Sequence, residues 1–277
     1  MIVMENKKGR YNRLKTRMRF TKTGSLKFIG HLDCMRFFQK AIRRAKLDVS
    51  YSNGFTPHQI MSFASPLSVG LTSDGEYIDI EFNSLPEMSK EELIRYINQY
   101  MTEELFVTEI HVLEETSKTS MALLNACDYM ITLKDGTDFC HNTEAAADFS
   151  LRETFGKFME QEQITIRKKT KKSEQEIDLR PLILAYAFSK EAFEKLDGVA
   201  KLPELNHEYD SEEQLYLKLV SGSVTNIKPE LVLEAYMKYL DTRMKPFSYQ
   251  VHRIQMYFGK DTRKQAEGGS VPPEKQA

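Results

Sequence analysis

Two histidines near a carboxylate are the side chains of this sequence best suited to chemistry. His31 and Asp33 stand at the start of a predicted helix, and His58 stands in the Gly- and Pro-containing loop that follows it. If the loop folds back over the helix start, these three are candidates for acid–base catalysis, and the helix start also favours an anion. The predicted ligand pocket consists of His31, Asp33, Arg36, Tyr51, Ser52 and His58.

A purely structural role explains the same residues. Asp33 suits the positive end of a helix dipole. The ring nitrogens of His58 suit hydrogen bonds to loop carbonyls. The sequence leaves open whether these residues have a structural role alone or a structural role together with ligand contact.

Four basic side chains alternate with apolar or small ones along residues 13–20, which is the period of a half-buried strand. They are Arg13, Lys15, Arg17 and Arg19. An open sheet face of this kind can bind single-stranded RNA through basic side chains and aromatic rings, and Tyr77 is the candidate ring. Alternatively, acidic side chains at 79 and 81 on a neighbouring strand pair with Arg17 and Arg19 in a structural ladder. We favour the ladder.

Basic residues are concentrated at the front of the chain. The first 48 residues hold seven Lys and seven Arg against three acidic residues, a net charge of +11 (14 minus 3), so the remainder carries −12 (−1 minus 11). This asymmetry suggests a polyanion or an acidic partner. Further RNA-binding candidates are Arg43 and Arg44 on the predicted helix and, in a later basic run, Arg167, Lys168 and Lys169. For the later run, a solvated hairpin tip is the favoured alternative.

Several classes of function lack their signatures. None of the cysteines, Cys34, Cys127 and Cys140, belongs to a C-x-x-C pair, so a zinc ribbon or an iron–sulfur cluster is not expected. Neither a phosphate-cradling loop nor a dinucleotide fingerprint occurs. We therefore expect no cofactor and no metal. Because no apolar run approaches the roughly 20 residues that span a bilayer, a cytoplasmic protein without membrane contact is expected.

The periodicities predict an α+β protein made of two tandem ferredoxin-like (βαββαβ) subdomains with antiparallel sheets. The first, at 12–116, has strands at 13–20, 60–64, 78–82 and 106–113 and helices at 31–46 and 89–101. Ser89 and Glu92 form a capping box at the second helix, and 73–75 reads as a turn.

The second subdomain, at 120–259, has strands at 128–133, 164–168, 215–220 and 249–258 and helices at 144–160 and 229–240. An insertion at about 173–212 has no predicted structure. A flexible N-terminus (1–11) and a disordered tail (260–277) flank the two subdomains.

Motifs between residues 13 and 83 carry a family resemblance. They are Arg17-Met18-Arg19-Phe20, Lys22-x-Gly24, Phe28-x-x-His31-Leu32-Asp33-x-x-Arg36, Tyr51-Ser52-x-Gly54-Phe55-x-Pro57-His58 and Ser73-x-x-Glu76-Tyr77-x-Asp79. Together they resemble the radical SAM-linked protein family, a bacterial group of unknown function whose members are fused to a radical SAM protein or encoded beside one.

The resemblance implies a radical SAM protein as a partner in trans, supplying the cluster and the radical chemistry that this chain lacks. It also implies that the substrate is RNA, either tRNA or rRNA. No DNA is expected. We therefore expect an accessory protein that positions RNA for that partner. The alternatives are a stand-alone RNA-processing or hydrolytic enzyme using His31 and His58, and a protein–protein adaptor without nucleic acid.

Overall fold

The computed structural model of the chain describes residues 13–134, 150–169, 174–204, 213–222, 225–243, 245 and 247–259. The predicted flexible N-terminus, the predicted disordered tail, Cys140 and parts of the predicted insertion lie outside these residues. Within them, no helix is long and apolar enough to cross a membrane. They divide into two compact units, one of 13–124 with 255–259 and one of 125–254.

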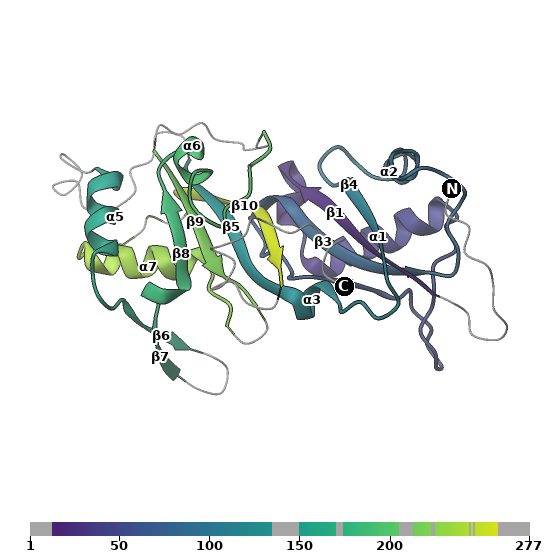
Figure 1. Cartoon of the computed structure of the whole chain (residues 1–277), viewed down its shortest axis with the longest axis horizontal. Coiled ribbons are helices and arrows are strands. Elements are labelled where there is room, and N and C mark those ends of the chain that lie inside the picture. Colours follow the sequence, from purple (N-terminus) through teal and green to yellow (C-terminus); the bar gives the residue numbers. More distant parts are fainter. Residues whose placement is uncertain are drawn as a thin grey trace. The chain divides into compact units, whose positions relative to one another are not determined.

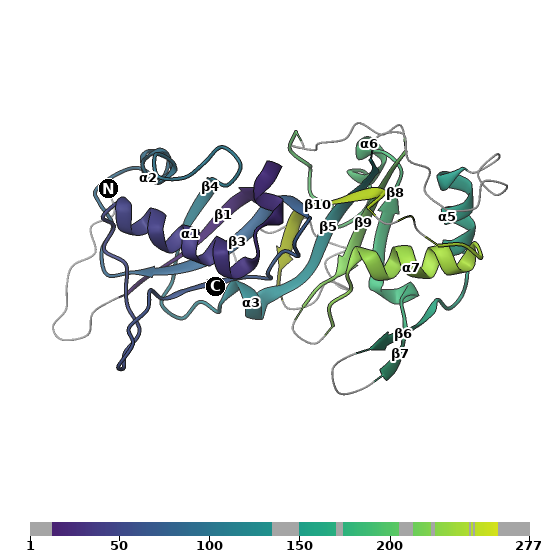
Figure 2. The same ribbon diagram turned by 180° about the vertical axis from the view of Figure 1, so that it is seen from behind.

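The first unit is a sheet covered by helices on one face (Figure 1). Its elements are β1 (Leu14–Lys22), the 3-10 helix η1 (Gly24–Phe28), α1 (His31–Arg44), β2 (Met61–Phe63), β3 (Thr72–Phe82), α2 (Lys90–Asn98), β4 (Val107–Leu113) and α3 (Ser120–Leu123). Strands β4, β1 and β3 are neighbours in that order, β2 adds to β3, and these pairs are antiparallel. In Figure 2, α1 lies across β1 and β3.

One apolar core lies between this sheet and its two longer helices. Met18 and Phe20 of β1 are buried, and Phe38 and Ile42 project from α1 at helical spacing into the same cluster. The alternation along β1 therefore separates an apolar face towards α1 from a charged face on the other side of the sheet. The predicted capping box of α2 is confirmed, since the Ser89 side chain accepts from the Glu92 N–H and the Glu92 carboxylate accepts from the Ser89 N–H.

The turn predicted at 73–75 is wrong, because these residues lie inside β3. The register moves from Phe20 opposite Glu76 to Lys22 opposite Ser73, so β3 holds one residue more than β1 over this stretch. A β-bulge absorbs such a residue, and glycine is common there. Gly75 thus marks an irregular strand rather than its end.

The strands of the second unit follow the order β10-β5-β9-β8, and the pairs β5–β9 and β8–β9 are antiparallel. Its strands are β5 (Leu124–Leu133), β8 (Ile183–Ala187), β9 (Gln214–Val220) and β10 (Tyr249–Phe258), of which the last four residues of β10 belong to the first unit. A separate hairpin pairs β6 (Thr165–Lys169) with β7 (Glu174–Asp178). The helices are α5 (Leu151–Met159), α6 (Lys190–Phe193), α7 (Pro229–Tyr239) and the 3-10 helix η2 (Arg180–Leu182).

The structure confirms an α+β protein with mostly antiparallel sheets. In the first unit the elements follow the predicted order β-α-β-β-α-β. In the second unit the strand predicted at 164–168 pairs outside the main sheet, and β8, from within the predicted insertion, lies beside β9 instead. Charge explains the difference, because the basic run of β6 suits an exposed hairpin better than a buried sheet. A tandem ferredoxin-like repeat stays a prediction.

Candidate functional site

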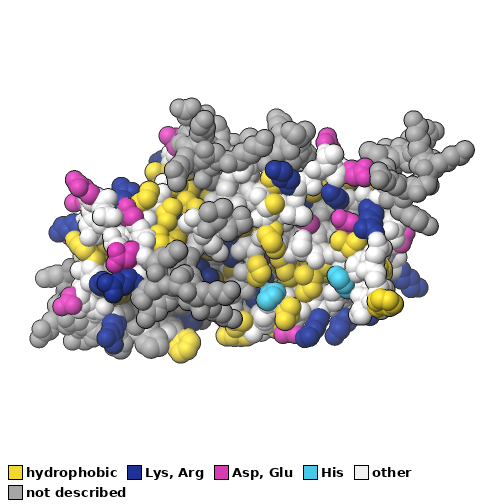
Figure 3. Space-filling model, turned by 90° about the horizontal axis from the view of Figure 1, so that it is seen from below, with side chains coloured by type: hydrophobic (Ala, Val, Ile, Leu, Met, Phe, Trp, Pro, Cys, Tyr) yellow, Lys and Arg dark blue, Asp and Glu magenta, His cyan; other side chains and the backbone are white. Residues whose placement is uncertain are grey.

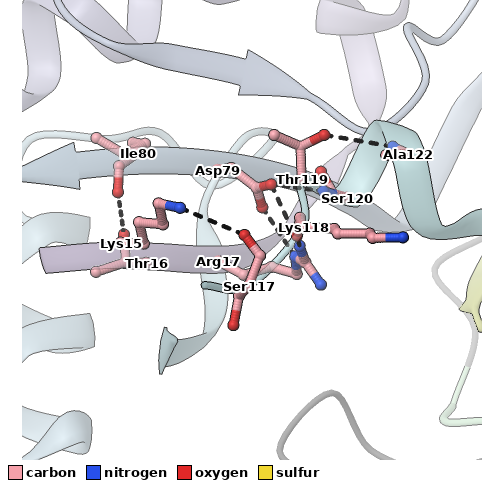
Figure 4. Close-up of polar contacts among 10 residues, drawn as sticks. All are labelled: Lys15, Thr16, Arg17, Asp79, Ile80, Ser117, Lys118, Thr119, Ser120 and Ala122. Atoms are coloured by element: carbon pink, nitrogen blue, oxygen red, sulfur yellow. Dashed lines mark hydrogen bonds and ion pairs between the residues drawn. The ribbon is translucent and has the colours of Figure 1, made fainter. Parts of the chain in front are cut away.

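The basic side chains of β1 have partners within the protein, and Figure 4 shows those of Lys15 and Arg17. Arg17 is 2% exposed, and its Nε and Nη2 lie 2.8 and 3.3 Å from the two carboxylate oxygens of Asp79. Nη2 also donates to the carbonyl of Lys118 at 3.0 Å. A buried guanidinium with these partners is satisfied internally, so Arg17 is not available to a phosphate.

Arg19 is also paired with a carboxylate of the protein, but its partner is Glu109 and not the expected Glu81. The register places Tyr77 opposite Arg19 on β3, and Glu109 opposite it on β4. Arg19 therefore pairs with Glu109 at 3.0 Å, while Glu81 pairs with Arg13 at 3.4 Å. The hydrogen bond from His111, with the nearby Arg19, lowers the pKa of Glu109. Tyr77 is 3% exposed and packs edge-on against Phe258, so its ring is no open stacking surface.

A pocket of about 150 Å³ lies on this charged face, beneath the segment that follows β4. Lys15 donates to the carbonyls of Glu115 and Ser117, and the Ser120 N–H donates to Asp79 at 2.6 Å. These bonds hold the segment over the sheet (Figure 4). The pocket, which we name the sheet pocket, is lined among others by Ile60, Met61, Ser62, Glu81, Leu113 and Ser117.

His31 lines a second, much smaller cavity, of about 10 Å³, which is room for about one water. Its polar neighbours there are Lys22, Cys34 and Glu76. The Lys22 ammonium donates to the carbonyl of Ile29 at 2.9 Å. Burial raises the pKa of the Cys34 thiol to about 12, so this thiol stays protonated and unreactive near neutral pH.

His58 does not line the cavity of His31. Its Nδ1 lies 2.9 Å from the Ser52 hydroxyl, which also accepts from the His58 N–H at 3.1 Å, within a hairpin closed by the bridge between Tyr51 and Gln59. The Gln59 side chain donates to the carbonyl of Gln39, eight residues, or about 12 Å of helix, beyond His31. The hairpin is thereby tied to the middle of α1 and not to its start.

The remaining predicted pocket residues lie on the surface. Asp33 and Arg36 form an exposed ion pair of 2.9 Å along α1. On the face shown in Figure 3, exposed histidine side chains lie apart from one another, with hydrophobic and basic side chains around them. In the described part of the chain, no three His, Cys, Asp or Glu side chains gather closely enough to hold a metal ion.

The other basic candidates are exposed. Arg43 and Arg44 lie on the outer side of α1, as does Lys40, and none of these side chains has an ion-pair partner among the described residues. Arg167 pairs with Glu176 across the β6–β7 hairpin at 3.3 Å, with both side chains exposed. The side chains of Lys168 and Lys169 lie outside the described ones.

Reasoning from the sequence missed Lys22 and Glu76 as site residues, and it missed the sheet pocket. A signal existed for the first two, because Lys22-x-Gly24 and Glu76-Tyr77 both belong to the motifs that carry the resemblance. Gly24 itself has a φ of +53°, and a Cβ there would collide with the Glu104 carboxylate that caps η1. The sequence of residues 114–119 has no periodic pattern that would predict a segment covering a pocket.

The fold and these two cavities define an α+β protein with a charged, partly roofed sheet face. The chain matches the domain family DUF2344, described as an uncharacterized protein conserved in bacteria, over residues 15–229, and it belongs to that family. No curated protein matches the chain. The family description names no activity and no link to radical SAM enzymes or to RNA.

Proposed function

We propose that this protein is an accessory factor that binds RNA, tRNA or rRNA, through the outer face of α1 and positions it for a radical SAM enzyme acting in trans. The observation that carries RNA binding is the exposed basic stripe of α1, formed by Lys40, Arg43 and Arg44. The sequence resemblance supports the radical SAM partner.

The internal pairing of the basic side chains of β1 supports α1, rather than β1, as the proposed RNA contact. Arg17 and Arg19 of β1 form ion pairs with carboxylates of the same protein. The stripe of α1 instead lies opposite the apolar side of the helix, where Phe38 and Ile42 enter the core. Unpaired lysine and arginine side chains on one helix face contact phosphates and release counterions, which produces affinity without sequence specificity.

Replacing Lys40 and Arg44 together by glutamine is expected to weaken binding of single-stranded RNA and to flatten its salt dependence. Each lost phosphate contact reduces the slope of log K against log salt concentration by about 0.7 for a single strand. Losing both contacts therefore lowers the slope by about 1.4. Fluorescence anisotropy with a labelled oligonucleotide across a salt series measures both effects.

A matched control removes one Arg and one Lys elsewhere, through Arg95→Gln on α2 and Lys157→Gln on α5, both exposed. Because the net charge changes equally, a general electrostatic effect would move both double variants together. Equal losses in the two variants, or no measurable RNA binding by the wild type, would overturn the assignment to α1. Thermal unfolding of each variant checks that the fold is retained.

The partner is tested by gentle tagged purification from cells, with the co-purifying proteins and RNA identified together. Recovery of a radical SAM protein with a defined RNA supports the accessory function. Recovery of a protein partner whose binding resists salt and carries no RNA would favour a protein–protein adaptor instead. A hydrolytic site shared by His31 and His58 is not favoured, because His58 does not line the His31 cavity.

A further inference from the structure

The sheet pocket has the size and the walls of a site for one planar ring. Its volume of about 150 Å³ matches a cavity that holds a benzene-sized ring. Residues of β1, β2 and β3 line the pocket, and Ile60 and Leu113 contribute apolar walls. A ring-sized pocket with apolar walls favours an aromatic ligand over a flexible chain, because a rigid ring loses little conformational entropy on binding.

Hydrogen-bonding groups at the pocket have capacity left for a ligand. The hydroxyls of Ser62 and Ser117 have no hydrogen-bond partner among the residues that the structure describes. The Glu81 carboxylate contacts Arg13 at 3.4 Å through one oxygen, which leaves most of its acceptor sites unused. A ligand ring bearing an N–H donor is therefore complementary to Glu81, and a ring acceptor is complementary to either serine.

Two lysines of the pocket lining add positive charge. Lys118 lines the pocket, is exposed and has no ion-pair partner in the described part of the chain. Lys15 also lines it, with its ammonium held at the carbonyls of the roof. Two lysines in the lining of a ring-sized pocket suit a ligand that joins a planar base to a phosphate.

We propose that the sheet pocket binds a single nucleobase, either of a free nucleotide or of an unstacked nucleotide in RNA. Glu81 accepts a hydrogen bond from the exocyclic amine of the base, as carboxylates do from cytosine, and Lys118 contacts the phosphate. The site prefers adenine, cytosine or guanine over uracil, because the only base-pairing donor of uracil is its N3–H, which lies between two carbonyl oxygens that repel the carboxylate of Glu81. It lies on the sheet face opposite α1, so it stands independently of RNA binding by the basic stripe.

Titration with the four nucleoside 5′-monophosphates tests this directly, with ribose 5-phosphate as the ligand without a base. Backbone amide shifts in NMR spectra report where each ligand binds. We expect at least one amine-bearing nucleotide to bind with shifts centred on β2 and the roof segment, UMP to bind at least fivefold more weakly, and ribose 5-phosphate not to bind. No binding by any of the four at millimolar concentration would overturn the proposal.

Two variants locate the ligand. Ser117→Trp places a large ring in the pocket from the roof and should weaken nucleotide binding at least tenfold. Thr116→Trp, at the exposed neighbouring position that does not line the pocket, should change it by less than twofold. Equal effects of the two variants would contradict the assignment. Glu81→Gln, whose amide can donate to a base carbonyl, should erase the preference against UMP without preventing binding.

The source of the base is distinguished with a short RNA oligonucleotide. If the pocket takes an unstacked RNA base, Ser117→Trp weakens oligonucleotide binding as well, and its effect adds to that of the Lys40 and Arg44 replacements. If the ligand is a free nucleotide, Ser117→Trp leaves oligonucleotide binding unchanged. Failure of RNA binding at α1 leaves the nucleotide titration unaffected, so the two proposals fail separately.

Discussion

Replacing Asp79 by alanine is expected to destabilise the protein by about 3–5 kcal/mol, because it leaves the buried guanidinium of Arg17 without its carboxylate. Arg17 is 2% exposed, so its guanidinium has little contact with water that could compensate for the lost carboxylate. The Ser120 N–H loses its acceptor in the same variant. Urea unfolding followed by circular dichroism measures the change in the free energy of unfolding.

A second aspartate supplies the control for this experiment. Asp33 pairs with Arg36 at 2.9 Å, close to the 2.8 Å of the Arg17–Asp79 pair. Both Asp33 and Arg36 are exposed, however. Exposed pairs contribute at most about 1 kcal/mol, so Asp33→Ala should cost little. Similar losses for the two alanine variants would show that burial does not govern these pairs.

Replacing both members of the buried pair tests whether the unpaired charge of Arg17 causes the loss of stability in Asp79→Ala. The double variant Arg17→Met with Asp79→Leu has no uncompensated charge and should recover much of the stability that Asp79→Ala loses. A double variant as unstable as Asp79→Ala would indicate that the shape of the site, rather than its charge, is decisive. The result also separates the structural ladder from an RNA-binding role for β1.

The stability of the protein should rise relative to a variant without the Asp128–Lys218 pair as the pH increases from about 8 to 10.5. Lys218 on β9 lies opposite Asp128 on β5, 3.5 Å from it, and the two side chains are 8% and 0% exposed. Burial lowers the pKa of Lys218 to about 8, against the attraction of Asp128.

The sign follows from proton counting. Between pH 8 and 10.5, Lys218 has lost its proton in the folded protein but keeps it in the unfolded chain. Because the unfolded state binds more protons in this window, the free energy of unfolding increases with pH. The full increase is on the order of 3 kcal/mol, at 1.36 kcal/mol for each unit of pKa.

The measurement compares the wild type with Asp128→Leu/Lys218→Met by urea unfolding at pH 7.5 and 10.5. Burial also raises the pKa of Cys34 and of Tyr216 to about 12, and their contributions to stability are lost as the pH rises above about 9. Both proteins keep these groups, so their effect cancels in the difference. A difference in stability that does not change with pH would refute the lowered pKa of Lys218.

Local signals in the sequence were reliable where neighbouring residues decide the structure. The apolar spacing of α1 and the capping box at Ser89 depend on contacts within a few residues, and both elements form close to their predicted ranges. The Ser73–Gly75 signal was also real, although it marks a bulge in β3 and not a turn. A bulge and a turn use the same backbone freedom of glycine, so only the pairing with β1 distinguishes them.

The site depended on distances that the sequence does not contain. Lys22 and Glu76 are 54 positions apart, yet the antiparallel pairing of β1 and β3 places both at the cavity of His31. His58 is closer to His31 in sequence, but the hydrogen bond of Gln59 holds its hairpin at Gln39.

Strand and helix periodicity in the sequence predict that β1 has one apolar and one basic face and that α1 carries a basic outer stripe, because side-chain direction follows from that periodicity. Which of these charges remain available to a ligand depends on contacts between residues far apart in the sequence. Arg17 and Arg43 are the same residue type in the same basic segment, but only Arg17 meets a carboxylate and loses its water. Desolvation and pairing act across space, and the roof over β1 comes from residues about 100 positions away.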